Sequence, residues 1–263
     1  MNLKSGADYS LITERPDAGA TQEQITRLYQ RYHFARQFAE NKDVLEAACG
    51  SGIGLGYLAK AAGRTVGGDI DEKNVSLAKE HYRNRAGIQI GLMDAHNLPF
   101  ADAEFDLVLL YEAIYYLKSP EQFAGEAARV LRKEGKLIVC TVNKDWEDFH
   151  PSPYACRYFS VPELSTLLKK HFPEVVIYGA FPVTKGGIKD SAVSLIKRTA
   201  VAMNLIPGSL KARTYLKRIF IGKLTLLPAE IYEGMACYQE PVPTPSAEIN
   251  RNFKIIYGIA AKN

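Results

Sequence analysis

A short glycine-rich stretch follows the first strongly apolar run of the chain and has the composition of a ligand-binding loop. Residues 44–48 form that run and are expected to be a buried strand. Gly50 and Gly52 come next, ahead of an expected helix over residues 53–62. Glycines at such a point let the backbone turn tightly and approach a ligand at the helix N-terminus. The stretch therefore predicts a nucleotide-type binding loop.

Acidic residues near this loop indicate the charge of its ligand. Glu46 lies at the end of the first strand, where a carboxylate would repel a pyrophosphate and attract an ammonium or a sulfonium. Asp69 ends the next expected strand, where a carboxylate can accept hydrogen bonds from two ribose hydroxyls. Asp94 follows the third expected strand and can accept from an adenine amino group. Three acids at three strand ends predict a nucleoside with a cationic part.

A dinucleotide fits the same loop less well. Its G-x-G-x-x-G fingerprint would start just after the strand, whereas the third required position, counted from Gly50, is Leu55. The looser form that runs from Gly54 to Ala59 starts too far into the helix. A nicotinamide oxidoreductase is therefore disfavoured. The purely structural alternatives are a tight turn for the loop and a helix-capping role for Asp69.

Strands and helices alternate over the first two thirds of the chain. Strands are expected over residues 44–48, 65–70, 88–92, 105–111, 136–142, 174–181 and 252–261. Helices are expected over residues 21–40, 53–62, 72–85, 120–132 and 161–171. Such alternation implies an α/β protein with a parallel sheet and right-handed crossovers. About 70 residues separate the last two strands, which is too long for a simple connection and predicts an inserted subdomain.

Several motifs in order resemble the class I S-adenosylmethionine-dependent methyltransferases, and more closely their small-molecule branch that includes the ubiquinone/menaquinone type. The matching runs are residues 45–52 (LEAACGSG), 66–71 (VGGDID), 94–100 (DAHNLPF) and 105–108 (FDLV). Glu46 stands where the family usually has Asp, and Ala48 where it usually has the first Gly. The resemblance extends over about residues 43–181 and the final strand, and the ordered set is more specific than any single motif.

The resemblance implies a Rossmann-like sheet of seven strands in the order 3-2-1-4-5-7-6, with strand 7 antiparallel and a helical insertion. It implies S-adenosyl-L-methionine as cofactor and S-adenosyl-L-homocysteine as product. The donor-binding residues expected at the strand ends are Glu46, Ala48, Gly50, Gly52, Asp69, Ile70, Asp94, Ala95 and Tyr111. The expected parts of the chain are an N-terminal helical segment (1–42), the methyltransferase core (43–181 plus 252–263) and an inserted basic helical cap (182–251).

Groups that contact the methyl acceptor are expected after the fourth and fifth strands, because ligands bind outside the carboxyl ends of the strands. These segments supply Glu112, Tyr115, Tyr116 and Trp146 as substrate-binding candidates. His150 is the candidate general base, since its ordinary pKa near 6.5 suits proton removal at neutral pH. An exposed loop position is an equally good interpretation of this histidine. Methyl transfer from a sulfonium is an in-line displacement that needs no metal, and we expect no metal site.

Two nucleobase-directed chemistries are disfavoured by the sequence. Residues 110–113 (LYEA) lack the N/D-P-P-Y/F run that enzymes methylating adenine amino groups usually carry after the fourth strand. Cys140 could be the nucleophile of a pyrimidine C5 enzyme, but it lies in a buried-strand pattern where cysteine behaves as a small hydrophobe.

The insertion differs in charge from the rest of the chain, whose net charge is +4 over 263 residues. Residues 185–225 contain nine basic residues and one acid, Asp190. A basic amphipathic cap over the acceptor entrance suits an anionic acceptor, a lipid-linked phosphate or a membrane surface. A solvated helix face is the plainer alternative. Nucleic acid is disfavoured as a partner because the segment has few aromatic residues.

The composition and motifs together predict a cytoplasmic enzyme that methylates a small molecule. With 47% hydrophobic and 24% charged residues, the chain is not disordered as a whole. It begins without a signal-peptide pattern, and its four scattered cysteines suggest no disulfide framework. The expected acceptor is a sugar, a glycan precursor or a lipid-like intermediate, methylated on oxygen rather than nitrogen. The alternatives are an RNA or protein methyltransferase and a donor-binding protein without turnover.

Overall fold

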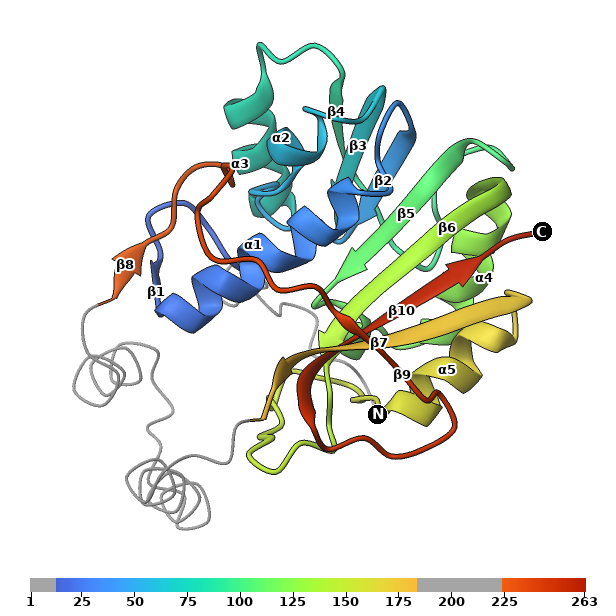
Figure 1. Ribbon diagram of the computed structural model, residues 1–263. Helices are drawn as coiled ribbons and strands as arrows, with labels where there is room; N and C mark the ends of the chain where they lie inside the picture. The colour runs from blue at the N-terminus through green and yellow to red at the C-terminus, as the bar shows by residue number, and fades with distance from the viewer. Residues whose placement is uncertain (1–12, 184–223) are drawn as a thin grey trace.

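The computed structural model describes residues 13–183 and 224–263, which are built around one twisted sheet (Figure 1). The order of its eight strands is β4-β3-β2-β5-β6-β10-β7-β9. Their bounds are β2 (Asp43–Ala47), β3 (Arg64–Asp69), β4 (Ile88–Leu92), β5 (Phe105–Tyr111), β6 (Leu131–Val142), β7 (Glu174–Pro182), β9 (Val242–Thr244) and β10 (Phe253–Ala261). The first seven in this row have the predicted order 3-2-1-4-5-7-6. β9 adds an unpredicted eighth strand at the edge.

The direction of the strands also follows the prediction. β2, β3, β4, β5 and β6 pair in parallel. β10 is antiparallel to both of its neighbours, β6 and β7. β9 pairs antiparallel with β7. Because the central strands run the same way, their carboxyl ends meet at one edge of the sheet, where a ligand site is expected.

Helices cover both faces of the sheet (Figure 1). They are α1 (Gln22–Arg36), α2 (Leu55–Leu58), α3 (Glu72–Tyr82), the 3₁₀ helix η2 (Ile114–Tyr116), α4 (Pro120–Val130) and α5 (Val161–Lys169). Alternate residues of β5 feed two cores: Leu107 and Leu109 pack with residues of α1 and α2, whereas Val108 and Leu110 pack with residues of α4 and α5. This is the period of two that a buried strand imposes. Among the described helices, none has both the length and the apolar character needed to cross a membrane.

Some predicted boundaries were wrong. The helix expected over residues 53–62 has only four α-helical residues, because three-residue turns replace the helical pattern on both sides of it. The helix expected to reach residue 40 ends at Arg36. β6 starts at Leu131, five residues earlier than expected, where Leu131 pairs with Phe105 of β5. Of the predicted cap, the described residues 224–251 form β8 (Thr225–Leu226), β9 and turns. The basic run over residues 185–223 lies outside the described residues.

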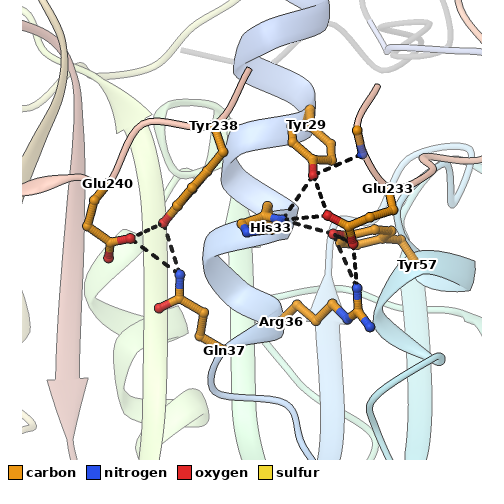
Figure 2. Close-up of polar contacts among 9 residues, drawn as sticks. Tyr29, His33, Arg36, Gln37, Tyr57, Glu233, Tyr238 and Glu240 are labelled. Carbon is orange, nitrogen blue, oxygen red and sulfur yellow. Dashed lines mark hydrogen bonds and ion pairs between the residues drawn. The ribbon is translucent and has the colours of Figure 1, made fainter. Parts of the chain in front are cut away.

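Residues 227–240, which we call the strap, fasten α1 to its neighbours. The Glu233 carboxylate accepts hydrogen bonds from the hydroxyls of Tyr29 (2.7 Å) and Tyr57 (2.8 Å) and from the guanidinium of Arg36 (2.6 Å). Figure 2 shows Glu233 between these side chains, with His33 beside them. Further along, Tyr238 donates to Glu240 and accepts from Gln37 of the same helix region.

A second acid of the strap holds α3. Glu230 contacts the His81 ring at 2.8 Å and accepts from the Arg85 guanidinium at 2.9 Å. The backbone N–H of Ile231 donates to the carbonyl of Ile53, in the glycine-rich loop region. The strap therefore joins α1, α2 and α3, the three helices nearest to the glycine-rich loop.

We expect Glu233→Gln to lower the free energy of unfolding by about 1 kcal/mol, because two buried tyrosine hydroxyls lose a charged acceptor while Glu233 itself is largely exposed. The melting temperature should fall by about 2–4 °C. The matched control is Glu80→Gln, which removes the charge of an exposed acid paired with Arg83 at 2.8 Å. Equal melting temperatures for the two variants would contradict a fastening role for Glu233.

Candidate active site

A cavity of about 470 Å³ lies at the carboxyl ends of the central strands. Its size is within the range of small-molecule sites, about 300–1,000 Å³. The predicted residues that line it are Glu46, Ala48, Gly50, Asp69, Ile70, Asp94, Ala95, Tyr111, Glu112, Tyr115 and Tyr116. Gly52, Trp146 and His150 are not among the lining residues. The fold thus brings both the donor-side and the acceptor-side candidates to one place.

The glycine-rich loop has the backbone conformation expected of a tight ligand-binding turn. Ala48, Gly50 and Gly52 have φ angles of 56°, 57° and 75°, in the left-handed region that favours glycine. Ala48, in place of the usual glycine, carries a strain of roughly 1–2 kcal/mol. At Gly50 a Cβ atom would lie 2.5 Å from Cγ2 of Thr13. Gly50 therefore leaves space for the N-terminal segment to cover the loop.

Asp69 shapes the loop and also faces the cavity. Its carboxylate accepts hydrogen bonds from the backbone N–H groups of Gly50 and Asp71, both at 2.9 Å. Burial raises its pKa, and these two N–H groups oppose that shift. The cap of α3 is Asp71, whose side chain accepts from the N–H of Lys73. Asp69 is thus not the capping residue, and a carboxylate has lone pairs left for a ribose.

Glu46 is a buried acid, and only one of its two carboxylate oxygens is hydrogen-bonded among the described residues. It is 1% exposed, and its Oε1 accepts a hydrogen bond of 2.5 Å from the hydroxyl of Tyr32 on α1. Within the described part of the chain, its Oε2 has no hydrogen-bond partner. Burial raises the pKa of Glu46 to about 7, although the Tyr32 hydrogen bond and the charge of Arg31 oppose this. An ionised Glu46 therefore needs a cationic partner.

Asp94 is fixed by the residue two positions after it. Its Oδ1 accepts from the His96 N–H at 2.9 Å and contacts His96 Nδ1 at 2.7 Å. His96 Nε2 accepts from the N–H of Ser119, the N-cap of α4, so the ring proton is assigned to Nδ1. Burial raises the pKa of Asp94, but the His96 hydrogen bonds outweigh it and the net shift is downward. Asp94 stays ionised and able to accept from an adenine amino group.

Helix α1 supplies side chains that sequence reasoning missed. Arg27 and Arg31, one turn apart, line the cavity with Tyr32. The Arg31 side chain is only 7% exposed and pairs with Glu14. Burial disfavours its charge, yet Glu14 keeps the pKa of Arg31 well above the ordinary value. The sequence shows that Arg27 and Arg31 are four residues apart. It does not show that this face of α1 lines the cavity.

The acceptor-side candidates separate into two groups. Glu112, Tyr115 and Tyr116 follow β5 and line the cavity. Trp146 lies in the loop after β6, where the Lys254 ammonium is 5.6 Å from its ring centroid. His150 is exposed in the same loop. The tyrosine pair continues into an aromatic row, since Tyr115 stacks on Tyr158 with ring centroids 5.0 Å apart.

Comparison with known proteins agrees with this geometry. Residues 45–139, which extend from β2 to β6, match the family model described as a methyltransferase domain. A probable S-adenosylmethionine-dependent methyltransferase of Mycobacterium tuberculosis is 34% identical over 145 residues, which are 53% of this chain and 52% of that protein. Residues 45–139 therefore match a methyltransferase domain, and the chain is similar to S-adenosylmethionine-dependent methyltransferases. The cofactor of this family is S-adenosyl-L-methionine.

One further relative and one solved structure are similar to this chain. A fatty-acid O-methyltransferase of Mycolicibacterium smegmatis is 36% identical over 182 residues, or 66% of this chain and 61% of that protein. The crystal structure of the YcgJ protein from Bacillus subtilis has a TM-score of 0.56 at 16% identity, covers 92% of this chain and 99% of that one, and is similar in fold. The chain spans about half the length of the first curated relatives it matches. The ubiquinone/menaquinone branch remains a prediction.

The ionisation of Glu46 predicts how donor-site affinity depends on pH. Below about pH 7 Glu46 is mostly neutral and attracts the ligand ammonium weakly, so affinity for S-adenosyl-L-homocysteine should increase as the pH rises through 7. The increase should level off near pH 8, where Glu46 is mostly ionised and the ligand amino group is still protonated. Calorimetric titration between pH 5.5 and 8.5 measures it. In Glu46→Gln the increase should disappear, and an unchanged pH profile would exclude Glu46 as the ammonium partner.

Tyr32→Phe tests the contact between α1 and Glu46. The Tyr32 hydroxyl lowers the pKa of Glu46, so its removal should move the midpoint of the affinity increase to higher pH. A role limited to packing would leave the midpoint in place. Tyr238→Phe, which removes a hydroxyl bonded to Glu240 on the strap, is the control and should keep the wild-type midpoint.

Proposed function

We propose that this chain transfers the methyl group of S-adenosyl-L-methionine to an oxygen atom of a small molecule. The observation that carries the proposal is the buried Glu46, which lines the same cavity as Asp69 and Asp94 and whose Oε2 is unpartnered within the described residues. The three carboxylates match the ammonium, the ribose and the adenine of the donor. A pyrophosphate-containing cofactor would be repelled by Glu46.

The cavity divides into a donor side and an acceptor side. The donor side is formed by the ends of β2, β3 and β4, and the acceptor side by α1, Glu112 and η2. Gly50 lets the backbone approach the methionine part of the donor, and Gly52 permits the turn that follows it. Methyl transfer is accelerated mainly by alignment of the acceptor with the sulfonium and by exclusion of water. Thr13 and Glu14, which also line the cavity, help to exclude water from it.

Among the candidate acceptors, a lipid-like molecule is best supported. The aromatic row from Tyr116 and Tyr115 to Tyr158 and Phe149 offers an apolar surface next to the cavity, with ring centroids 4.5–5.0 Å apart. The similarity to a fatty-acid O-methyltransferase supports an oxygen acceptor on such a molecule. The proposed contact of residues 185–225 with an anionic or membrane surface rests largely on residues outside those described.

Parallel calorimetric titrations with S-adenosyl-L-methionine, S-adenosyl-L-homocysteine and NAD test the donor assignment. Both sulfur ligands should bind with dissociation constants near 1 μM, or about −8 kcal/mol, and NAD should not bind. Binding of NAD alone would refute the proposal. Donor binding without formation of S-adenosyl-L-homocysteine with any acceptor would instead favour a donor-binding protein.

We expect Asp69→Asn to weaken binding of S-adenosyl-L-homocysteine by about 10- to 100-fold, because a charged acceptor for the ribose hydroxyls is lost. The same titration measures the effect. Asp102→Asn is the matched control: it changes an acid whose side chain is 80% exposed and pairs with Arg129, away from the cavity. If Asp69→Asn bound the ligand as tightly as the control, the ribose role would be excluded.

A further inference from the structure

Glu112 has a strained backbone at the point where β5 ends. Its φ angle is 50°, in the left-handed region that non-glycine residues rarely adopt. A hydrogen bond of 2.8 Å from the Glu112 N–H to the carbonyl of Cys140 holds the backbone in this conformation. Strained residues that the surrounding structure holds in place occur mainly at functional sites. The consequence here is that the Glu112 side chain lines the cavity.

The two carboxylate oxygens of Glu112 differ in their contacts. Oε2 accepts a hydrogen bond of 3.0 Å from the hydroxyl of Tyr115. Among the described residues, Oε1 has a long contact of 4.0 Å from the thiol of Cys140, and a thiol is a weak donor. Tyr115 therefore fixes the carboxylate, while Oε1 keeps the capacity to accept a stronger hydrogen bond.

Charged and titratable groups surround Glu112 on several sides. They are Arg27 and Arg31 from α1, Glu14 from the segment before α1, Tyr115 from η2 and Cys140 from β6. Burial raises the pKa of Glu112, and the two arginines oppose that shift. A buried carboxylate whose affinity for protons is raised above the ordinary value has the properties of a general base.

We propose that Glu112 removes the proton from a hydroxyl group of the methyl acceptor. The proposal rests on the proposed methyltransferase function and names its substrate class: a neutral hydroxyl rather than a carboxylate, which is already ionised and needs no base. His150, the candidate base from the sequence, is exposed and does not line the cavity. Tyr115 is a positioning residue for Glu112.

The proposed methyl transfer conserves atoms and electrons. The acceptor oxygen forms a bond to the donor methyl carbon, and the hydroxyl proton passes to Oε1 of Glu112. The bond between that carbon and sulfur breaks, and its electron pair stays on sulfur, which becomes the thioether of S-adenosyl-L-homocysteine. Glu112 is then a neutral carboxylic acid and returns its proton to water after product release.

The first experiment needs no acceptor. The protein is labelled with ¹³C in the glutamate carboxyl groups, saturated with S-adenosyl-L-homocysteine and titrated by NMR, and Glu112→Gln identifies the Glu112 signal by its loss. The apparent pKa of Glu112 should lie above the ordinary glutamate value, because burial raises it. Tyr115→Phe should raise it, because the lost hydrogen bond lowers the pKa of Glu112. An apparent pKa at or below the ordinary glutamate value would overturn the proposal.

The second experiment measures turnover with two matched probe series. The hydroxyl series is 1-decanol and phenol, the carboxylate series is decanoate and benzoate, and formation of S-adenosyl-L-homocysteine is followed. We expect turnover of the hydroxyl series, and a decrease in kcat of about 10²- to 10⁴-fold in Glu112→Gln. Its affinity for S-adenosyl-L-homocysteine should stay within twofold of wild type. Glu112→Asp should retain part of the activity.

Each outcome decides a specific point. The control Glu121→Gln, at an acid 3.6 Å from Arg157 and outside the cavity lining, should keep the wild-type kcat. A wild-type kcat in Glu112→Gln, or turnover of the carboxylate series alone, would overturn the proposal while the methyltransferase function stands. If neither series is turned over, the hydroxyl class is rejected for these probes and the NMR titration decides on the base. Failure of the wild-type protein to bind either sulfur ligand would instead refute the proposed function.

Discussion

The contact between Tyr32 and Glu46 is the constraint on which the rest of the site depends. Removal of a carboxylate from water costs several kcal/mol unless it is paired and hydrogen-bonded. Glu46 receives one hydrogen bond, from Tyr32 of α1, and its second oxygen has no partner among the described residues. A cation in the cavity would therefore stabilise the ionised form of Glu46. The helix that provides Tyr32 must be held firmly, because a small displacement would leave Glu46 without its hydrogen bond.

Helix α1 meets this demand by using two faces. Arg27 and Arg31 lie one turn apart and line the cavity. Tyr29, His33 and Arg36 follow the same helical spacing on the side that contacts the strap (Figure 2). The ion pair of Glu233 with Arg36 is largely exposed and is worth little by itself. The pair instead helps to fix the position of α1, whose other face places Arg27 and Arg31 at the cavity.

The sequence allowed the sheet order, the glycine-rich loop and the strand-end acids to be predicted, because these depend on local patterns and on a family resemblance. The roles of Glu14 and Tyr32 could not be predicted, because an amphipathic helix reveals its buried face but not the partner of that face. His150 was selected for its ordinary pKa, whereas the structure shifts the pKa of Glu46 and Glu112 by burial. Burial of this kind follows from contacts between segments far apart in the chain.

The two buried carboxylates also explain why such a site favours the proposed reaction. Before transfer, the cavity would hold a sulfonium cation and the Glu112 anion. After transfer it would hold a thioether and a neutral carboxylic acid, so two opposite charges disappear together. A buried environment solvates separated charges poorly, and a step that removes them gains relative to the same step in water. Burial raises the pKa of Glu112, and the charge of Arg31 opposes that shift; Glu46 would stay paired with the donor ammonium throughout. Burial therefore destabilises the ionised form of each acid and, for the same reason, favours a transfer that removes charge.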